Sequence, residues 1–343
     1  MDLPLLTTAL AKLGEPAYRE RQVWRWAAQG AAGFAEMTDL PLNLRAALEQ
    51  AVPYSSLTLV HEAYASDGTV KALFDTADGR PVEAVLMRYR DGRRSLCLSS
   101  QSGCPLTCTF CATGQMRFGR NLTASEILDQ ALHFRRTGAV DHAVFMGMGE
   151  PMMNLDSVLG ACERLPAIGI SHRHTAVSTI GWIPGIERLA DQPMPIRLAL
   201  SLHAADDALR SELMPVNDRY PLADVLAACR SYYEHKRRMV FVEYVMLAGV
   251  NDSYAQARQL AEVLDPRTFK VNLIPYNPTD SPFRGSSPKA IEAFRAELER
   301  HGLGATVRLT RGRDIAAACG QLAAKGVEQS ATTVSRRAAA SPG

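Results

Sequence analysis

The spacing of hydrophobic positions changes twice along this chain. Over residues 1 to about 52 these positions recur at helical spacing, most clearly in Ala17–Gln29 and Leu42–Gln50. From Leu57 to Ser99 the apolar runs become short and alternating. Asp-Gly pairs, which favour tight hairpins, interrupt this second stretch at residues 67–68, 78–79 and 91–92. The pattern therefore predicts a helical N-terminal part followed by an antiparallel β meander.

Beyond this meander, strand-length apolar runs alternate with helical patterns. The runs lie near residues 93–99, 142–148, 175–178, 196–202, 239–247, 269–276 and 305–310. The helical patterns lie at Ala124–Arg136, Leu155–Leu165, Leu222–His235, Ala255–Leu264 and Pro288–His301. Such alternation indicates parallel strands joined by right-handed crossovers. The count gives about six βα units instead of the eight of a complete barrel, so we expect an α/β fold with an open, partial (β/α)6 barrel.

These changes divide the chain into five expected segments. They are an N-terminal helical accessory domain (1–52), an antiparallel β extension (53–89), a core barrel (90–312), a short C-terminal segment (313–326) and a disordered tail (327–343). Arginines are interleaved with the apolar positions of the first segment. That segment fits either a small helical bundle with solvated arginines or an RNA-docking module.

Composition narrows the class of protein. A chain of 343 residues that is 47% apolar can bury a barrel-sized core. The net charge of +2 means that any surface for nucleic acid must be a local patch. Seven cysteines without a secretory leader favour the reducing cytoplasm, and the sequence lacks an apolar run of about 18 residues. We therefore expect a cytoplasmic protein that does not interact with a membrane.

Three cysteines at CxxxCxxC spacing, Cys104, Cys108 and Cys111, follow the first strand of the expected barrel. Thiolates are the usual ligands of a [4Fe–4S] cluster, and three of them leave one iron open. A structural zinc site requires four ligands, so a zinc knuckle would need Cys97 or a histidine to complete it. The spacing resembles the signature of radical S-adenosylmethionine (SAM) enzymes, in which the open iron binds SAM.

A second motif, Met146-Gly-Met-Gly-Glu-Pro151, follows the next strand. Its glycines allow the backbone to approach a ligand, and the Glu150 carboxylate suits an ammonium group. The motif resembles the GGEP-type sequence that binds the SAM amino group. Other expected strands end in polar groups, each of which alone also fits a cap or a turn. These groups are Ser178, the segment Ser201-Leu202-His203, and Asn277.

Two further cysteines lie near the ends of the expected barrel. Cys97 is on the strand that leads into the cysteine loop, and Cys319 follows the last strand, next to Gly320. The first and last strand ends of a barrel can meet across its mouth, so this pair suggests thiol–disulfide chemistry. Alternatively, each is simply a buried small residue, which is how we interpret Cys162 and Cys229 within helices.

Together these motifs resemble the RlmN/Cfr family of radical-SAM RNA methyltransferases. The resemblance runs from about Ala17 to Leu322 and includes the sequence Arg311-Gly-Arg-Asp-Ile-Ala-Ala-Ala-Cys-Gly-Gln-Leu322. It implies methylation of an adenine ring carbon in large-subunit ribosomal RNA and, in many members, in tRNA. It also implies a monomer that receives electrons from a flavodoxin-like donor.

The resemblance implies a role for each candidate residue. Cys319 would be S-methylated by one SAM, and a second SAM would give a 5′-deoxyadenosyl radical, so each methylation would consume two SAM. Cys97 would resolve the covalent RNA intermediate by forming a disulfide, and Glu83 would accept the ring proton. The [4Fe–4S] ligands would be Cys104, Cys108 and Cys111, and the SAM contacts Gly149, Glu150, Ser178, Ser201, Leu202, His203 and Asn277.

Different segments of the chain resemble family members that methylate different adenine carbons. Segments 108–114, 178–181 and 214–221 look Cfr-type, which would mean C8, whereas Arg308–Gly312 looks RlmN-type. We favour C2. Two other classes stay open: a radical-SAM activase acting on a protein glycine, which would need no Cys97/Cys319 pair, and a non-catalytic iron–sulfur or zinc RNA-binding protein.

The target adenine must leave its stack to enter a barrel mouth. Arginines near that mouth are candidates for phosphate contacts, although each alone also fits a solvated charge. They are Arg88, Arg90, Arg93, Arg94, Arg117, Arg120 and Arg311, of which we favour the cluster at 88–94.

Overall fold

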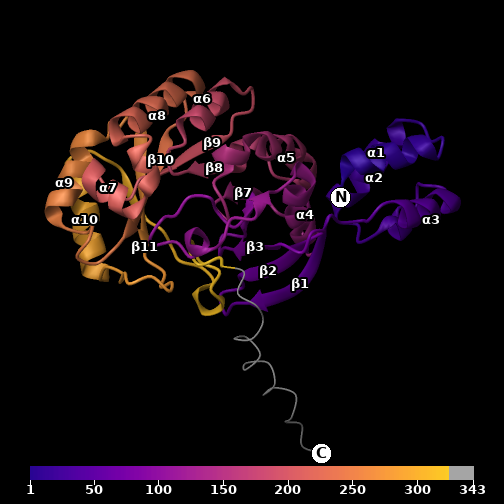
Figure 1. Ribbon diagram of the computed structural model, residues 1–343, viewed down its shortest axis with the longest axis horizontal. Coiled ribbons are helices and arrows are strands. Elements are labelled where there is room, and N and C mark those ends of the chain that lie inside the picture. Colours follow the sequence, from indigo (N-terminus) through magenta and orange to yellow (C-terminus); the bar gives the residue numbers. More distant parts are fainter. Residues whose placement is uncertain (324–343) are drawn as a thin grey trace, which may run out of the picture.

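The computed structural model describes residues 1–323, and the tail expected at 327–343 lies outside them. The described chain consists of a small helical lobe beside a large curved sheet whose outer side is covered by helices (Figure 1). The sheet has ten strands in the order β1-β2-β3-β4-β7-β8-β9-β10-β11-β12. Within this sheet, each strand lies beside the strand that precedes it and the strand that follows it along the chain. This order is expected for a barrel built from successive βα units.

The lobe at the N-terminus contains α1 (Leu3–Lys12), α2 (Tyr18–Gln29) and α3 (Leu42–Ala51). Helix α2 buries a stripe that includes Val23 and Trp24 and packs against helices of the main body. The helix ends at Gly30, whose φ of 103° suits glycine. The predicted helices are therefore present, and two of the interleaved arginines form ion pairs inside the lobe, Arg19 with Glu15 and Arg25 with Asp39.

The predicted antiparallel meander is confirmed. It contains β1 (Leu57–Tyr64), β2 (Val70–Thr76), β3 (Pro81–Arg88) and β4 (Arg94–Cys97), each pair antiparallel. The glycine of each Asp-Gly pair has a positive φ: 82° at Gly68, 70° at Gly79 and 87° at Gly92. Strand β4 also pairs in parallel with β7, so it joins the meander to the barrel.

The remaining strands of this sheet are parallel, as the alternation predicts. They are β7 (His142–Phe145), β8 (Thr175–Thr179), β9 (Arg197–Ser201), β10 (Val240–Met246), β11 (Phe269–Pro275) and β12 (Ala305–Val307). Within residues 1–323, β12 pairs only with β11 and the sheet does not close. The open, partial α/β barrel is therefore confirmed.

Helices cover the outer side of this sheet (Figure 1), and seven follow the N-terminal lobe within residues 1–323. They are α4 (Ala124–Arg135), α5 (Leu155–Ile168), α6 (Ile183–Asp191), α7 (Asp207–Leu213), α8 (Leu222–Lys236), α9 (Tyr254–Val263) and α10 (Pro288–Arg300). The sequence did not predict α6 and α7. Helix α6 begins with Ile-Pro-Gly, and α7 has only seven residues, so neither shows a long apolar period.

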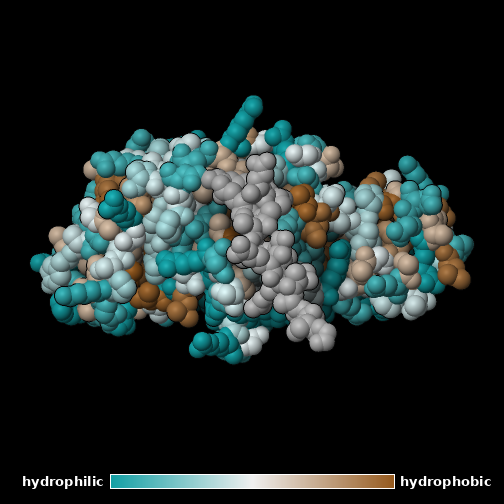
Figure 2. All heavy atoms as spheres, turned by 90° about the horizontal axis from the view of Figure 1, so that it is seen from below, coloured by the Kyte–Doolittle hydropathy of each residue, from teal (hydrophilic) through white to brown (hydrophobic). Residues whose placement is uncertain are grey.

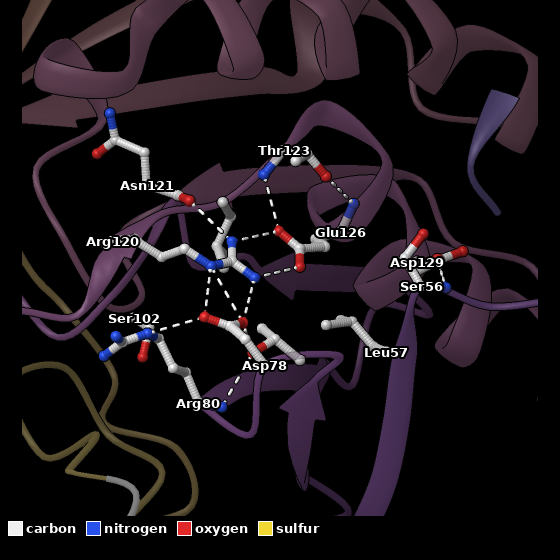
Figure 3. Close-up of polar contacts among 12 residues, drawn as sticks. Ser56, Leu57, Asp78, Arg80, Ser102, Arg120, Asn121, Thr123, Glu126 and Asp129 are labelled. Atoms are coloured by element: carbon white, nitrogen blue, oxygen red, sulfur yellow. Dashed lines mark hydrogen bonds and ion pairs between the residues drawn. The ribbon is translucent and has the colours of Figure 1, made fainter. Parts of the chain in front are cut away.

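A short two-stranded sheet, β5 (Gln101–Ser102) with β6 (Arg120–Asn121), brackets the cysteine loop. Arg120 on β6 lies between two carboxylates, 2.7 Å from Asp78 in the β2–β3 turn and 2.7 Å from Glu126 in α4 (Figure 3). Glu126 also closes the capping box of α4 with Thr123. Arg120 therefore ties three elements together instead of lying free for a phosphate contact.

Figure 2 shows the side of the molecule that faces downward in Figure 1. The visible surface is mostly hydrophilic, with small separate hydrophobic groups. Among residues 1–323, no helix combines the length and the apolarity that crossing a bilayer requires.

Candidate active site

A cavity of about 150 Å³ lies at the C-terminal ends of strands β7 to β11. This is the end of a parallel barrel where ligands are usually bound. The three cysteines of the CxxxCxxC loop line the cavity together with Cys319. Six of the expected SAM contacts also line it: Gly149, Glu150, Ser178, Ser201, His203 and Asn277. The seventh, Leu202, is instead buried in the hydrophobic core.

The cysteine loop is anchored where Thr109 N donates to Leu213 O at 3.0 Å. Burial raises the pKa of Cys104 to about 12, and burial together with the nearby thiols raises that of Cys108 well above its usual value. Bound iron would supply the positive charge that keeps such buried thiols ionised. No three His, Cys, Asp or Glu side chains in the described part of the chain gather around a single-ion site.

Glu150 is a buried carboxylate that faces the cavity and is only 3% exposed. Its two oxygens accept hydrogen bonds from Met152 N and Ile180 N, both at 3.0 Å. Burial nevertheless raises the pKa of Glu150 to about 7. A ligand ammonium would offset this burial and favour the ionised carboxylate.

The glycine before Glu150 is required by close packing. Gly149 has a φ of 95°, and a Cβ there would lie 2.5 Å from the side chain of Gln101. Gln101 Oε1 in turn accepts a hydrogen bond from Glu150 N at 2.8 Å. Gln101 is therefore a supporting residue that sequence reasoning missed, because only the folded loops bring it to the Gly-Glu turn.

His203 serves both the fold and the cavity wall. Its Nδ1 accepts a hydrogen bond from Val245 N at 3.0 Å, and its ring packs edge-on against Phe110. Burial lowers the pKa of His203 to about 3, so the ring is neutral at physiological pH. Nearby, Ser178 and Ser201 share a hydrogen bond at 3.3 Å between their hydroxyls.

The segment that carries Cys319 lies against the cysteine loop. Asn277 Nδ2 donates to Cys319 O at 3.2 Å, and Ala112 N donates to Gly320 O at 2.8 Å. Thr113 Oγ1 donates to Leu322 O at 2.5 Å. Since Ala112 and Thr113 follow Cys111 directly, these bonds place Cys319 beside the cysteine loop.

Cys97 and Cys319 share a second, smaller cavity of about 30 Å³. The expectation that the two ends of the barrel meet here is therefore supported by their common lining of this space. All seven cysteines of the chain are free thiols in this structure. Burial, and next the Cys319 sulfur, raise the pKa of Cys97 to about 12.

Glu83 lies on β3 and is almost fully buried. Lys71 Nζ is 2.9 Å from its Oε1, and its Oε2 accepts a hydrogen bond from Ala323 N at 3.0 Å. In this arrangement the carboxylate holds the end of the C-terminal segment next to the active site.

A polar group in the barrel interior was not assigned from the sequence. Arg308 Nη1 is 3.3 Å from Glu243 Oε2 and donates to Met146 Sδ at 3.2 Å. Asn272 Nδ2 donates to the other Glu243 oxygen at 2.9 Å. A carboxylate within the apolar run Val240–Met246 was the available signal, because a buried charge requires a partner.

Comparison with known proteins first establishes the class. Residues 98–261 match the family model described as Radical SAM superfamily, and residues 1–53 match the one described as Ribosomal RNA large subunit methyltransferase N-terminal domain. The fold and the cysteine loop thus belong to a radical SAM enzyme, a class that uses a [4Fe–4S] cluster and SAM.

Two curated relatives and one solved structure identify the family within this class. The chain is 46% identical to the probable dual-specificity RNA methyltransferase RlmN of Heliobacterium modesticaldum, covering 94% of this chain and 89% of the relative. It is 45% identical to dual-specificity RNA methyltransferase RlmN of Anaeromyxobacter sp., covering 95% and 90%. A crystal structure of a radical SAM methyltransferase from Sphaerobacter thermophilus is 44% identical with a TM-score of 0.90, covering 95% and 98%. The chain therefore belongs to the RlmN family of radical SAM RNA methyltransferases.

Proposed function

We propose that this enzyme methylates C2 of an adenine in large-subunit ribosomal RNA and in tRNA, with Cys319 as the methyl carrier. The observation that carries this proposal is the position of Cys319, which lines one cavity with the three loop cysteines and another with Cys97. The name of these relatives, dual-specificity RNA methyltransferase, supports two kinds of RNA substrate.

The residues present fit the cofactors of the class. Cys104, Cys108 and Cys111 would hold one cluster, and Glu150 would receive the SAM ammonium group. When bound and reduced by a flavodoxin-like donor, these cofactors supply a methyl group and a 5′-deoxyadenosyl radical, so that two SAM are consumed per methylation. Asn277 holds the carbonyl of Cys319 and thus positions the carrier segment.

The protein side chains then have distinct tasks. Cys319 Sγ accepts the methyl group, because a thiolate is a competent nucleophile and the adenine carbon is not. Once the transferred carbon links Cys319 Sγ to the adenine ring, the Cys97 thiolate would attack Cys319 Sγ: the S–S bond forms, the bond from Cys319 Sγ to that carbon breaks, and its electron pair stays with the carbon, which takes up a proton as the methyl group of the product. A thiol reductant restores both thiols. Glu83 would take the ring proton, which requires it to exchange its bonds to Lys71 and Ala323 N for the substrate.

We propose a role for each of the segments expected from the sequence. Residues 1–52 would dock RNA, 53–89 extend the sheet, 90–312 form the catalytic core and 313–326 carry Cys319. The match of residues 1–53 to a ribosomal RNA methyltransferase domain supports the docking role. We propose that the enzyme acts in the cytoplasm, as a monomer and away from membranes.

Nucleoside mass spectrometry tests the proposal. The anaerobically reconstituted enzyme would be incubated with SAM, reductant and unmodified ribosomal RNA or tRNA. We expect 2-methyladenosine from the wild type and from Cys162→Ala, whose thiol is buried in α5, but none from Cys319→Ala. Retained methylation in Cys319→Ala would refute the carrier role, and 8-methyladenosine would show Cfr-type chemistry instead.

A further inference from the structure

The barrel interior continues beyond the active-site cavity toward the N-terminal strand ends. A second space of about 590 Å³ opens there, within the size range of nucleotide-sized ligand sites. We call it the lower chamber. Its walls come from the beginnings of β4, β7, β8, β9 and β10, including Ser95, His142, Thr175, Arg197 and Phe241.

The two spaces are successive parts of one interior. Along β10, Phe241 lines the lower chamber, Val245 lines the active-site cavity, and Glu243 between them lines both. This is the alternation of a strand that points every second side chain inward. Met146 also lines both spaces, and it contacts Arg308, which pairs with Glu243, so these three side chains lie where the two spaces adjoin.

Three arginines gather where β8, β9 and β10 begin. Arg173 precedes β8, Arg197 opens β9 and Arg238 precedes β10, and we call them the arginine cluster. Within residues 1–323 none of the three has a carboxylate at ion-pairing distance. Arg238 donates to two backbone carbonyls, Pro195 O and Arg173 O. Parallel pairing of the three strands therefore concentrates positive charge that the described protein does not neutralise.

The arginines of this cluster lie close enough to repel one another. Burial, followed by the charges of Arg197 and Arg173, lowers the pKa of Arg238. The other cations near the chamber are already compensated: Arg93 lies 3.4 Å from Asp91, and Arg308 pairs with Glu243. The unpaired positive charge is therefore confined to the side of the chamber where the arginine cluster lies. A bound anion would relieve the repulsion among these three arginines.

The chamber also offers flat faces beside its charges. The Arg197 guanidinium lies 4.4 Å from the Phe241 ring centroid, and His142 and His174 stack at 4.2 Å with 16° between their planes. Arginine planes and aromatic rings are the surfaces on which unstacked RNA bases pack. The exposed side chains of Arg173 and His174 form the rim, so a solvent-borne strand can reach them.

We propose that the lower chamber binds the backbone of the substrate RNA, with Arg173 and Arg197 contacting a phosphate of the strand that leads to the target nucleotide and Arg238 adding charge behind them. This inference rests on the proposed function, since it identifies a part of the molecule that holds the RNA. The arrangement selects a single-stranded phosphodiester with splayed bases, because the chamber combines unpaired arginines with aromatic and imidazole faces.

Direct RNA binding tests this assignment. Kd would be measured by fluorescence anisotropy for a labelled, unmodified fragment of large-subunit ribosomal RNA, with the reconstituted full chain, at several salt concentrations. Single variants Arg173→Gln and Arg197→Gln should each weaken binding about tenfold, the effect of losing one charged hydrogen bond. Each should reduce the slope of log Kd against log salt by about 0.7. A fragment of permuted sequence should respond equally, because phosphate contacts carry no sequence information.

Two controls keep the test specific. Arg197→Lys keeps the charge and should recover most of the binding if Arg197→Gln fails through lost charge. Arg188→Gln removes an exposed arginine of α6 that pairs with Asp156 and should leave both Kd and salt slope unchanged. Methylation of Cys319 from SAM without RNA should be equal in the wild type and in Arg188→Gln, which shows that the control variant is intact.

The outcomes separate the two proposals. Unchanged RNA affinity and salt slope in both glutamine variants would overturn the RNA site, even if the wild type methylates RNA. Weaker binding of adenosine monophosphate with unchanged RNA binding would also overturn it and indicate a small phosphorylated ligand. A wild type that makes no methyladenosine would refute the proposed function, whereas the arginine dependence of RNA binding would still be measured independently.

Discussion

The pair formed by Arg308 and Glu243 should contribute strongly to stability, and Arg308→Met tests this. The two side chains lie 3.3 Å apart and are 24% and 3% exposed. At that distance, with an effective dielectric constant of about 20, their attraction is about 5 kcal/mol. Removing Arg308 leaves the buried Glu243 carboxylate with Asn272 as its remaining donor. Loss of one partner of a buried pair costs about 3–5 kcal/mol, and the partial exposure of Arg308 favours the lower end.

A loss of about 3 kcal/mol corresponds to a Tm decrease of roughly 4 °C for a chain of 343 residues. Tm would be measured anaerobically on the reconstituted enzyme by circular dichroism. The matched control is Arg295→Met, which removes an arginine from an exposed pair with Glu292 on α10. Exposed pairs contribute about 0–1 kcal/mol, so its Tm should change by about 1 °C or less.

A double-mutant cycle isolates the interaction itself. Glu243→Gln removes the buried charge, so the double variant Arg308→Met/Glu243→Gln should be more stable than Arg308→Met alone. The reasoning would be wrong if Arg308→Met lowered Tm no more than Arg295→Met. A coupling energy near zero in the cycle would equally show that the pair is not an energetic unit.

Three further changes probe other parts of the molecule. Glu150→Gln should weaken SAM binding at least tenfold in equilibrium dialysis, because an ammonium loses a charged partner; unchanged affinity would contradict the assigned contact. Cys97→Ala should accumulate a covalent RNA–protein adduct on denaturing gels, absent when Cys319 is also replaced; its absence in the single variant would refute the resolving role. Arg120→Ala should lower Tm by about 2 °C, since Glu126 is buried and loses its cation; a change below 0.5 °C would mean that the network in Figure 3 is energetically neutral.

The sequence predicted the order of elements well because the physical signals are local. Alternation of apolar runs with helical patterns defined the strands of the barrel, and Asp-Gly pairs marked all three turns of the meander. Helices α6 and α7 escaped because a Pro-Gly start and a length of seven residues remove the periodic signal. Cap residues such as Asp206, whose side chain accepts from Leu209 N, were the signal that remained.

The sequence predicted the site residues that belong to short local motifs and missed those that the fold brings together from distant positions. The loop cysteines and Glu150 were found, and the structure places them around one cavity. The Arg308–Glu243 pair joins residues 65 positions apart, and no local pattern encodes such a distance. The same holds for Arg120, whose surroundings on the sequence gave no indication that Asp78 and Glu126 would enclose it. A charged residue in the sequence can therefore be assigned to a ligand only after the fold shows whether another side chain of the protein already pairs with it.

The distribution of charge along the barrel interior explains why these groups can coexist. The carboxylate of Glu150 lies at the C-terminal end, where a cationic ligand is expected, and the arginine cluster lies at the opposite end, where a polyanion would bind. The paired Arg308 and Glu243 carry no net charge between them. If the arginines lay nearer to Glu150, they would compensate that carboxylate and weaken the binding of an ammonium group. The neutral Arg308–Glu243 pair between the two ends therefore lets one interior bind a cation and an anion at once, as the proposed reaction of SAM with RNA requires.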